Sequence, residues 1–354
     1  MRTYKIQEIS KIIFSGGTPS TQNRNFWDGD LPWLSSGETC NPYITMTNRR
    51  ITKEGANNSS TRLALKGDIV IASAGQGLTR GQTSFLKINT YINQSIIAIR
   101  CNPSYVIDQY LFYNLYSRYD EMRLLSDSSS TRGSITTKMI SDMNIILPSL
   151  EEQQHIVNTI GTIDDLIEFN NKIIDKLHAF SDLIYQNYLI NTANTAFIML
   201  GNCCEIKTGK LNAEASSING KYPFFTCGKD ELLIDDYAFD CKAIIVAGNG
   251  EISCKYYEGK FNAYQRTYVL SPTKYFNLFQ KACELGINDL IINSQGSVIK
   301  FITKGMLEAI SIPLNNETIT TNQKLASLYD LMFKYKKKNN KLKQIKQNLL
   351  SKYF

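Results

Sequence analysis

Few residues of this chain are spaced so that they could carry out a reaction. The Asn-Pro-Tyr segment at 41–43 lacks the second proline of the Asn/Asp-Pro-Pro-aromatic loop with which adenine methyltransferases grip a flipped base. The Gly-Gln-Gly segment at 75–77 lacks the third glycine of a dinucleotide-binding loop, and no Walker A sequence is present. Asp240, Glu258 and Lys260 faintly resemble a nuclease constellation, but charged loop residues usually stay solvated. The sequence therefore offers no convincing catalytic site.

The histidines and cysteines favour neither catalysis nor a metal site. His155 and His178 are the two histidines, and both fall in a predicted helix, where surface or packing roles are expected. The eight cysteines include no Cys-x-x-Cys pair, although a structural zinc site usually pairs close ligands in this way. We expect no cofactor and no metal in this chain.

The polar loops instead suit recognition of double-stranded DNA. Arg or Lys reads guanine and Asn or Gln reads adenine, while Ser, Thr and Lys hold phosphates. In the first half of the chain the predicted DNA-binding residues are Thr18, Ser20, Arg24, Gln76, Arg80, Gln94, Thr131, Arg132 and Ser134. In the second half they are Lys210, Asn249, Lys255, Tyr257, Gln265, Arg266, Gln295 and Ser297. For any one of them a turn-forming role is as plausible as a base contact, and Trp27 and Trp33 are expected in a core.

The bulk composition bounds these possibilities. A chain of 354 residues with 43% apolar and 11% aromatic content can bury cores in two domains, so disorder is not expected. The net charge of +7 favours an acidic partner such as nucleic acid, although many proteins with this excess bind none. No apolar run reaches the roughly 18 residues that span a bilayer, and we expect a cytoplasmic protein.

The elements that must position the polar loops form an internal repeat, in which the same sequence pattern occurs twice with an offset near 165 residues. Two stretches carry apolar residues at alternating three- and four-residue steps, which is the seam of a coiled coil. The seam members are Ile160, Ile163, Ile167, Ile174 and Leu177 in the first stretch and Leu325, Leu328, Met332, Leu342 and Leu349 in the second. Polar residues interrupt both seams and would fix which partner and alignment are allowed, at Asn170, Ser181, Asn339 and Lys346.

Charge predicts that the two helices pair with each other. The first helical segment, 151–194, holds 2 basic and 7 acidic residues, whereas the second, 315–354, holds 9 and 2. Opposite charges on matching seams favour an antiparallel pair, since the intervening module must loop back. A strand-like run ending in proline precedes each helix, and both helix starts carry a capping pattern, Ser149 with Glu152 and Thr320 with Gln323.

Short echoes upstream of each proline indicate a duplicated module. The apolar run at 66–72 before a glycine-rich turn is repeated at 242–247, and the Gln-containing strand at 93–99 is repeated at 264–270. The fold class that follows is α+β: two mixed, strand-rich modules separated by two long antiparallel coiled-coil helices, with a pseudo-twofold internal repeat.

Five further motifs stand out in the sequence. Those in the first half are Ser-Gly-Gly-Thr-Pro-Ser at 15–20, Lys-Gly-Asp-Ile-Val at 66–70 and Leu-Pro-Ser-Leu-Glu-Glu-Gln-Gln-His-Ile at 147–156. Those in the second half are Tyr-Pro-Phe-Phe-Thr-Cys-Gly at 222–228 and Gly-Lys-Phe-Asn-Ala-Tyr-Gln-Arg-Thr-Tyr-Val-Leu at 259–270. With these motifs the chain resembles the specificity subunits of Type I restriction-modification systems over nearly its full length. One departure is Leu-Asn-Asn-Glu at 314–317, which only loosely matches the Glu-Gln signature that follows the proline in the family.

The resemblance implies a DNA-recognition subunit that is not itself an enzyme. Two target recognition domains, 1–148 and 195–314, would each read one half of a bipartite DNA site. Spacer helices at 149–194 and 315–354 would set the gap and dock two methyltransferase subunits through the seam residues, and restriction motor-nuclease subunits would join for cleavage. S-adenosylmethionine, ATP and magnesium are expected in those partner subunits.

Two other functions stay open at the level of sequence. A coiled-coil adaptor that never touches DNA would fit the neutral second module, which holds 12 basic and 12 acidic residues over 195–314. A nuclease would use Asp240, Glu258 and Lys260. Salt-independent binding would favour the adaptor, because phosphate contacts release counterions and make affinity depend on salt.

Overall fold

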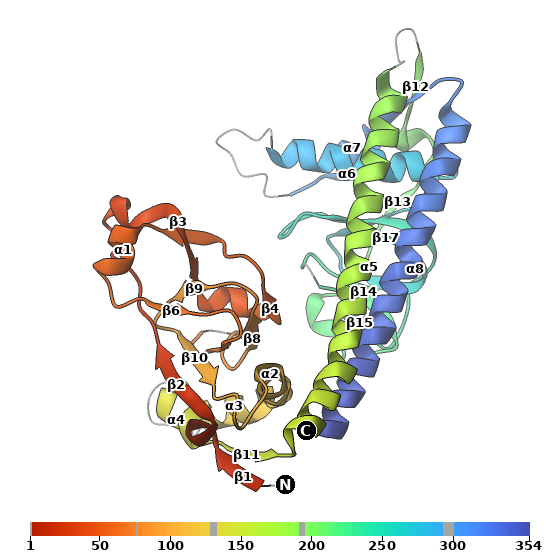
Figure 1. The fold of residues 1–354 in the computed structure, drawn as a ribbon. Helices are drawn as coiled ribbons and strands as arrows, with labels where there is room; N and C mark the ends of the chain where they lie inside the picture. Colours follow the sequence, from red (N-terminus) through yellow and green to blue (C-terminus); the bar gives the residue numbers. More distant parts are fainter. Residues whose placement is uncertain (1, 76, 128–132, 191–194, 229, 293–300) are drawn as a thin grey trace. The chain divides into compact units, whose positions relative to one another are not determined.

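The computed structural model describes residues 2–75, 77–127, 133–190, 195–228, 230–292 and 301–354, with the backbone alone over 288–292. The chain forms two compact units: residues 1–166 with 341–354, and residues 167–340. Each unit contains a strand-rich domain and a length of both long helices, α5 (Leu150–Ile190) and α8 (Thr318–Tyr353) (Figure 1). None of the helices in the described ranges is long and apolar enough to cross a membrane.

The first unit is built on two larger sheets. One has five strands in the order β2 (Ser10–Ser15), β10 (Ile96–Cys101), β7 (Ile69–Ala72), β8 (Thr83–Leu86) and β4 (Tyr43–Ile44). The other has four, in the order β5 (Arg49–Ile51), β3 (Trp27–Leu34), β9 (Thr90–Ile92) and β6 (Arg62–Ala64). The helices of the domain are α1 (Lys53–Asn57), α2 (Asp108–Ser117), α3 (Tyr119–Asp127) and α4 (Thr137–Asp142).

The second unit has one larger sheet. Its six strands run in the order β13 (Ile206–Thr208), β18 (Thr267–Leu270), β16 (Phe239–Ala247), β17 (Cys254–Ala263), β14 (Tyr222–Phe225) and β15 (Leu232–Ile234). Two helices, α6 (Phe276–Ile292) and α7 (Lys304–Glu308), follow the last of these strands in sequence. The side chains of α6 that face the domain core, among them Leu278 and Phe279, are fully buried.

Strand order confirms that the two units repeat one plan. The order β2-β10-β7-β8 of the first unit recurs as β13-β18-β16-β17 in the second. In the first unit β3 runs parallel to β9 and antiparallel to the edge strand β5, just as β14 runs parallel to the end of β17 and antiparallel to β15. The sequence echoes therefore mark structurally equivalent segments.

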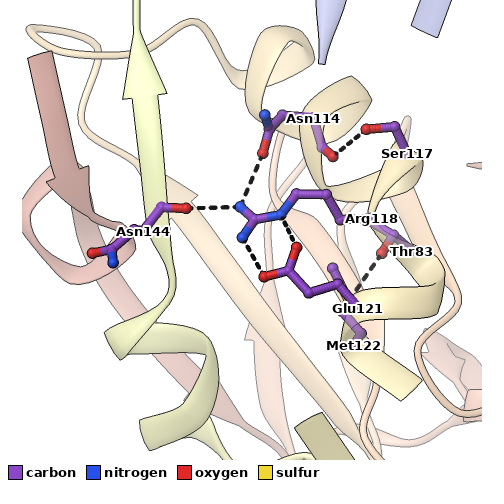
Figure 2. A network of polar contacts seen from close by, with 7 residues as sticks. All are labelled: Thr83, Asn114, Ser117, Arg118, Glu121, Met122 and Asn144. Carbon is purple, nitrogen blue, oxygen red and sulfur yellow. Dashed lines mark hydrogen bonds and ion pairs between the residues drawn. The ribbon is translucent and has the colours of Figure 1, made fainter. Parts of the chain in front are cut away.

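Each long helix starts from a strand that the domain holds in place. The strand β11 (Asn144–Leu147) pairs with β1 (Arg2–Lys5), and β19 (Ser311–Leu314) pairs with β12 (Ala196–Met199). Figure 2 shows how the guanidinium of Arg118 donates to the carbonyl of Asn144 at 2.9 Å and to the carboxylate of Glu121 at 2.6 and 2.7 Å. Arg118 thus ties β11, and with it the start of α5, to α2 and α3.

Of the two predicted helix caps, the structure confirms the one at Ser149 and contradicts the one at Thr320. The backbone amide of Glu152 donates to the hydroxyl of Ser149 at 3.3 Å, as the capping pattern predicts. The cap predicted at Thr320 is wrong, because α8 already begins at Thr318. Just before it, Asn315 forms a turn: its side-chain oxygen accepts from the amide of Glu317 at 2.9 Å, and its carbonyl accepts from the amide of Thr318 at 3.1 Å.

Hydrogen bonds show that α5 and α8 run antiparallel. In the first unit the ammonium of Lys346 donates to the carboxylate of Asp164 at 2.6 Å. In the second unit the amide of Asn170 donates to Asn339 at 2.7 Å, and the hydroxyls of Tyr188 and Thr318 are 3.1 Å apart, so within this unit later residues of α5 meet earlier residues of α8. All ten predicted apolar seam residues are buried or half-buried, and the polar seam residues Asn170, Ser181, Asn339 and Lys346 are buried with them.

Candidate nucleic-acid interface

In the first unit two buried indoles hold the predicted recognition loop at 15–24. The indole nitrogen of Trp27 donates to the carbonyl of Ser20 at 3.1 Å, and that of Trp33 donates to the carbonyl of Gly17 at 3.4 Å. The two rings pack edge to face with centroids 5.1 Å apart. The expectation that both tryptophans lie in a core is confirmed, and the same two residues also fix the backbone of the loop.

A close approach of backbone to backbone brings this loop to the predicted glutamine. The amide of Gly17 donates to the carbonyl of Ile92 at 3.1 Å, and a Cβ atom at Gly16 would lie only 1.9 Å from that carbonyl oxygen. Only glycine fits there. The hydroxyl of Thr18 then donates to the side chain of Gln94, two residues after Ile92.

The second unit builds the same corner from its own residues. The amide of Gly209 donates to the carbonyl of Thr267 at 3.3 Å, and a Cβ atom at Gly209 would lie 1.7 Å from the carbonyl oxygen of Ala263. Gln265 follows Ala263 by two residues, as Gln94 follows Ile92, and both glutamines are exposed. Each unit therefore presents an exposed glutamine beside a glycine loop.

Further predicted residues of the second unit meet at this corner. The amide of Gln265 donates to the carbonyl of Leu211 at 3.0 Å, next to Lys210. The amide of Gly248, which precedes Asn249, donates to the carbonyl of Arg266 at 2.9 Å. Lys210, Gln265 and Arg266 are exposed and carry the donors and acceptors that base or phosphate contacts require.

Other predicted residues have neighbours that give them a structural task. The guanidinium of Arg80 donates to the carboxylate of Asp127 and to the carbonyl of Gly133. Tyr257 packs against the rings of Phe225, Phe261 and Phe333 with centroids 5.3, 5.6 and 6.0 Å away, and burial raises the pKa of its hydroxyl. These two side chains brace the domains rather than project from them.

The remaining predicted residues differ in exposure. Ser20, Arg24 and Gln94 are exposed, whereas Thr18, Ser134 and Asn249 are half-buried. The ammonium of Lys255 donates to the carbonyl of Gly228 at 3.4 Å. Five predicted residues lie outside the residues that the structure describes: Gln76, Thr131, Arg132, Gln295 and Ser297.

The candidate nuclease residues Asp240, Glu258 and Lys260 lie on two paired strands. Asp240 faces Lys260 and Lys242 faces Glu258 across the antiparallel strands β16 and β17, and Glu258 accepts from the hydroxyl of Tyr256 at 2.8 Å. Within the described ranges, no three His, Cys, Asp or Glu side chains gather as metal ligands would. Burial lowers the pKa of His178 on α5.

Sequence reasoning missed three exposed arginines of the four-stranded sheet. Arg49 and Arg50 lie on the edge strand β5, and Arg62 lies on β6. The guanidinium of Arg49 lies 3.6 Å from the centroid of the Trp27 ring, and that of Arg62 lies 4.3 Å from the Phe14 ring. The adjacent arginines were visible in the sequence, but their place beside the tryptophans was not.

Residues 1–179 and 194–350 match the sequence pattern of the Type I restriction modification DNA specificity domain. The chain belongs to that family. The match covers nearly all of the chain.

Individual relatives share parts of the chain. The Type I restriction enzyme EcoDI specificity subunit of Escherichia coli is 44% identical over 118 residues, which are 33% of this chain and 27% of that subunit. The Type I restriction enzyme MjaIX specificity subunit of Methanocaldococcus jannaschii is 30% identical over 192 residues, 53% of this chain and 43% of the relative. The matches thus span less than half the length of these curated relatives.

A solved structure extends the comparison of the fold to the whole chain. The crystal structure of the Type I restriction-modification S subunit from M. genitalium superposes with a TM-score of 0.61. The match covers 100% of this chain and 96% of that one at 18% identity, so it shows a common fold.

Proposed function

We propose that this chain is the DNA sequence-specificity subunit of a Type I restriction-modification complex. Each strand-rich domain would read one half of a bipartite site in double-stranded DNA. The observation that carries the proposal is the repeated corner, in which a glycine loop packs beside an exposed glutamine, Gln94 in one unit and Gln265 in the other. Glutamine amides are suited to pair with adenine edges in the major groove.

The long helices would set the gap between the two half-sites. The helix α5 has 41 residues and is about 60 Å long at about 1.5 Å per residue, against about 34 Å for one turn of DNA. The buried Asn170–Asn339 hydrogen bond supports a fixed register, because a polar pair in an apolar seam is satisfied in one alignment only.

We propose that the partner subunits dock on a face of α5 other than the seam. The docking predicted from the sequence lay on the ten seam residues, but these are buried or half-buried within the chain. Phe169, Phe180, Leu183 and Ile190 are instead 61%, 54%, 57% and 73% exposed. These four repeat at heptad-compatible steps on one side of the helix. Such an exposed apolar stripe fits a helix of a methyltransferase subunit.

Catalysis would then belong to the complex and not to this chain. Two methyltransferase subunits would bring S-adenosylmethionine, and restriction motor-nuclease subunits would bring ATP and magnesium. The chain itself would contribute base reading and scaffolding. The cytoplasm, where DNA and these subunits meet, is the compartment that this function requires.

The test is co-expression of the chain with the methyltransferase encoded beside it, followed by sequencing of methylated adenines across the host DNA. We expect methylation at a split motif with a fixed gap. Absence of any new methylation, together with a stable complex whose DNA binding ignores salt concentration, would instead support a protein adaptor.

A further inference from the structure

The arginines of the first unit fall into two groups. Arg80, Arg100 and Arg118 each donate to a carboxylate, from Asp127, Asp68 and Glu121, and so brace the fold. In contrast, five exposed arginines have no carboxylate within 4.0 Å among the residues that the structure describes, namely Arg2, Arg24, Arg49, Arg50 and Arg62, and of these Arg50 donates to the carbonyl of Asp30 at 2.6 Å. The second group is available to an anionic ligand.

Arg49 is the member of this group whose position is best fixed. Its guanidinium stacks 3.6 Å above the Trp27 ring and lies 5.7 Å from the Trp33 ring. Stacking covers one face of the guanidinium and leaves the N–H groups at its edge able to donate hydrogen bonds. No described residue accepts a hydrogen bond from them. The same two indoles hold the carbonyls of Gly17 and Ser20, so Arg49 and the recognition loop share one support.

The equivalent edge strand of the second unit is apolar. In the first unit Arg49 lies opposite Trp33 and Arg50 opposite Pro32. In the second unit Leu232 lies opposite Phe224 and Leu233 opposite Pro223, in the same register. Leu232 and Leu233 are 37% and 41% exposed, so the second unit offers two surface leucines where the first offers two cations.

We propose that Arg49, supported by Trp27, binds a phosphate of the DNA backbone, and that the second unit has no counterpart at this position. The inference rests on the proposed function, and it makes the two recognition domains unequal. A guanidinium presents a planar set of donors that matches two phosphate oxygens. At this position the first domain would add a salt-dependent phosphate contact, whereas the second domain would offer an apolar surface.

The experiment measures affinity against salt concentration for the full chain in complex with its methyltransferase. The probe is a short duplex that carries the methylated motif of the wild-type complex. The variants are Arg49→Gln, Arg49→Lys, Leu232→Arg and the control Arg2→Gln, which removes an exposed charge from β1. Far-ultraviolet circular dichroism and melting verify that each variant is folded.

Loss of one phosphate contact should lower the slope of log affinity against log salt by about 0.9. We therefore expect Arg49→Gln to weaken binding about three- to tenfold at low salt and to leave the methylated motif unchanged. Arg49→Lys should keep the slope, Leu232→Arg should raise it by about one unit, and Arg2→Gln should leave it unchanged.

Three outcomes would overturn the proposal. An Arg49→Gln slope equal to that of the wild type would show that no phosphate is bound. A motif relaxed at one base would show that Arg49 reads a base instead. If the wild-type complex bound no duplex at all, the proposed function would fail as well, whereas the first two outcomes leave that function standing.

Discussion

At the scale of single residues, a buried polar group in the first unit surrounds Asp164. Its carboxylate accepts from Tyr43 at 2.6 Å, from Tyr113 at 2.9 Å and from Lys346 at 2.6 Å. The ammonium of Lys346 also lies 5.3 to 5.9 Å from the ring centroids of Tyr43, Tyr113 and Tyr116. Burial, aided by the nearby carboxylate, raises the pKa of Tyr43 and Tyr113, so both hydroxyls remain donors. The group joins the domain to both long helices within this unit.

Removing the Lys346 cation from its ion pair with Asp164 should destabilise the protein. We expect Lys346→Met to lower the free energy of unfolding by about 3 kcal/mol, because it leaves the Asp164 carboxylate buried without its cation. Lys172→Met is the matched control, since the Lys172–Glu168 pair is 67% and 63% exposed and should contribute less than about 1 kcal/mol. Urea unfolding measures both values. Similar losses for the two variants would contradict the role given to Lys346.

At the scale of elements, α5 has two faces with different tasks. One face is buried against α8 and the domains, with polar pairs such as Asn170 and Asn339 satisfied across the seam. The other carries the exposed stripe of Phe169, Phe180, Leu183 and Ile190. A buried face decides whether the chain folds, whereas an exposed apolar face matters only once a partner covers it.

Substitutions on the two faces should therefore separate folding from assembly. The double variant Phe180→Asp with Leu183→Asp should keep the melting temperature of the free chain but lose the complex with the methyltransferase on a sizing column. Ile163→Asp with Ile167→Asp should lower the melting temperature and disturb helix pairing, because these side chains lie in the seam. A complex that survives the first variant would move the docking face elsewhere.

At the scale of the whole molecule, the repeat makes the domains separable in function. Both units share a strand order and an edge-strand register, yet they differ in the residues that line their glycine loops. Specificity would then belong to each domain on its own, while the gap belongs to the helices.

Exchange of residues 1–148 for the equivalent domain of another specificity subunit tests this division. We expect the chimera to methylate a split motif with one half changed and with the other half and the gap retained. Adenine methylation sequencing reads all three features at once. A change in both halves, or a new gap length, would show that the domains and the helices do not act independently.

Much of the fold could be predicted from the sequence because it depends on periodic patterns. The heptad steps from Ile160 and from Leu325 determine two long helices, since apolar residues at that spacing must be buried together. The repeat, the opposite helix charges and the lead-in strands before Pro148 and Pro313 likewise depend on local spacing alone. Helix ends were less predictable, because a turn at Asn315 starts α8 at Thr318, two residues before the cap expected at Thr320.

Only the tertiary structure decided which polar side chains are engaged within the fold and which are exposed. Arg80 and Arg49 are alike in sequence terms, but one donates to Asp127 and the other stacks on Trp27 with its donors unused. That difference depends on contacts between residues far apart in the chain, which no local pattern records. The sequence alone does not show why glycine is required at 16 and 209. The structure places the carbonyls of Ile92 and Ala263 where a side chain would have to lie. Periodicity determines burial and pairing, whereas the availability of a polar group depends on its neighbours in space.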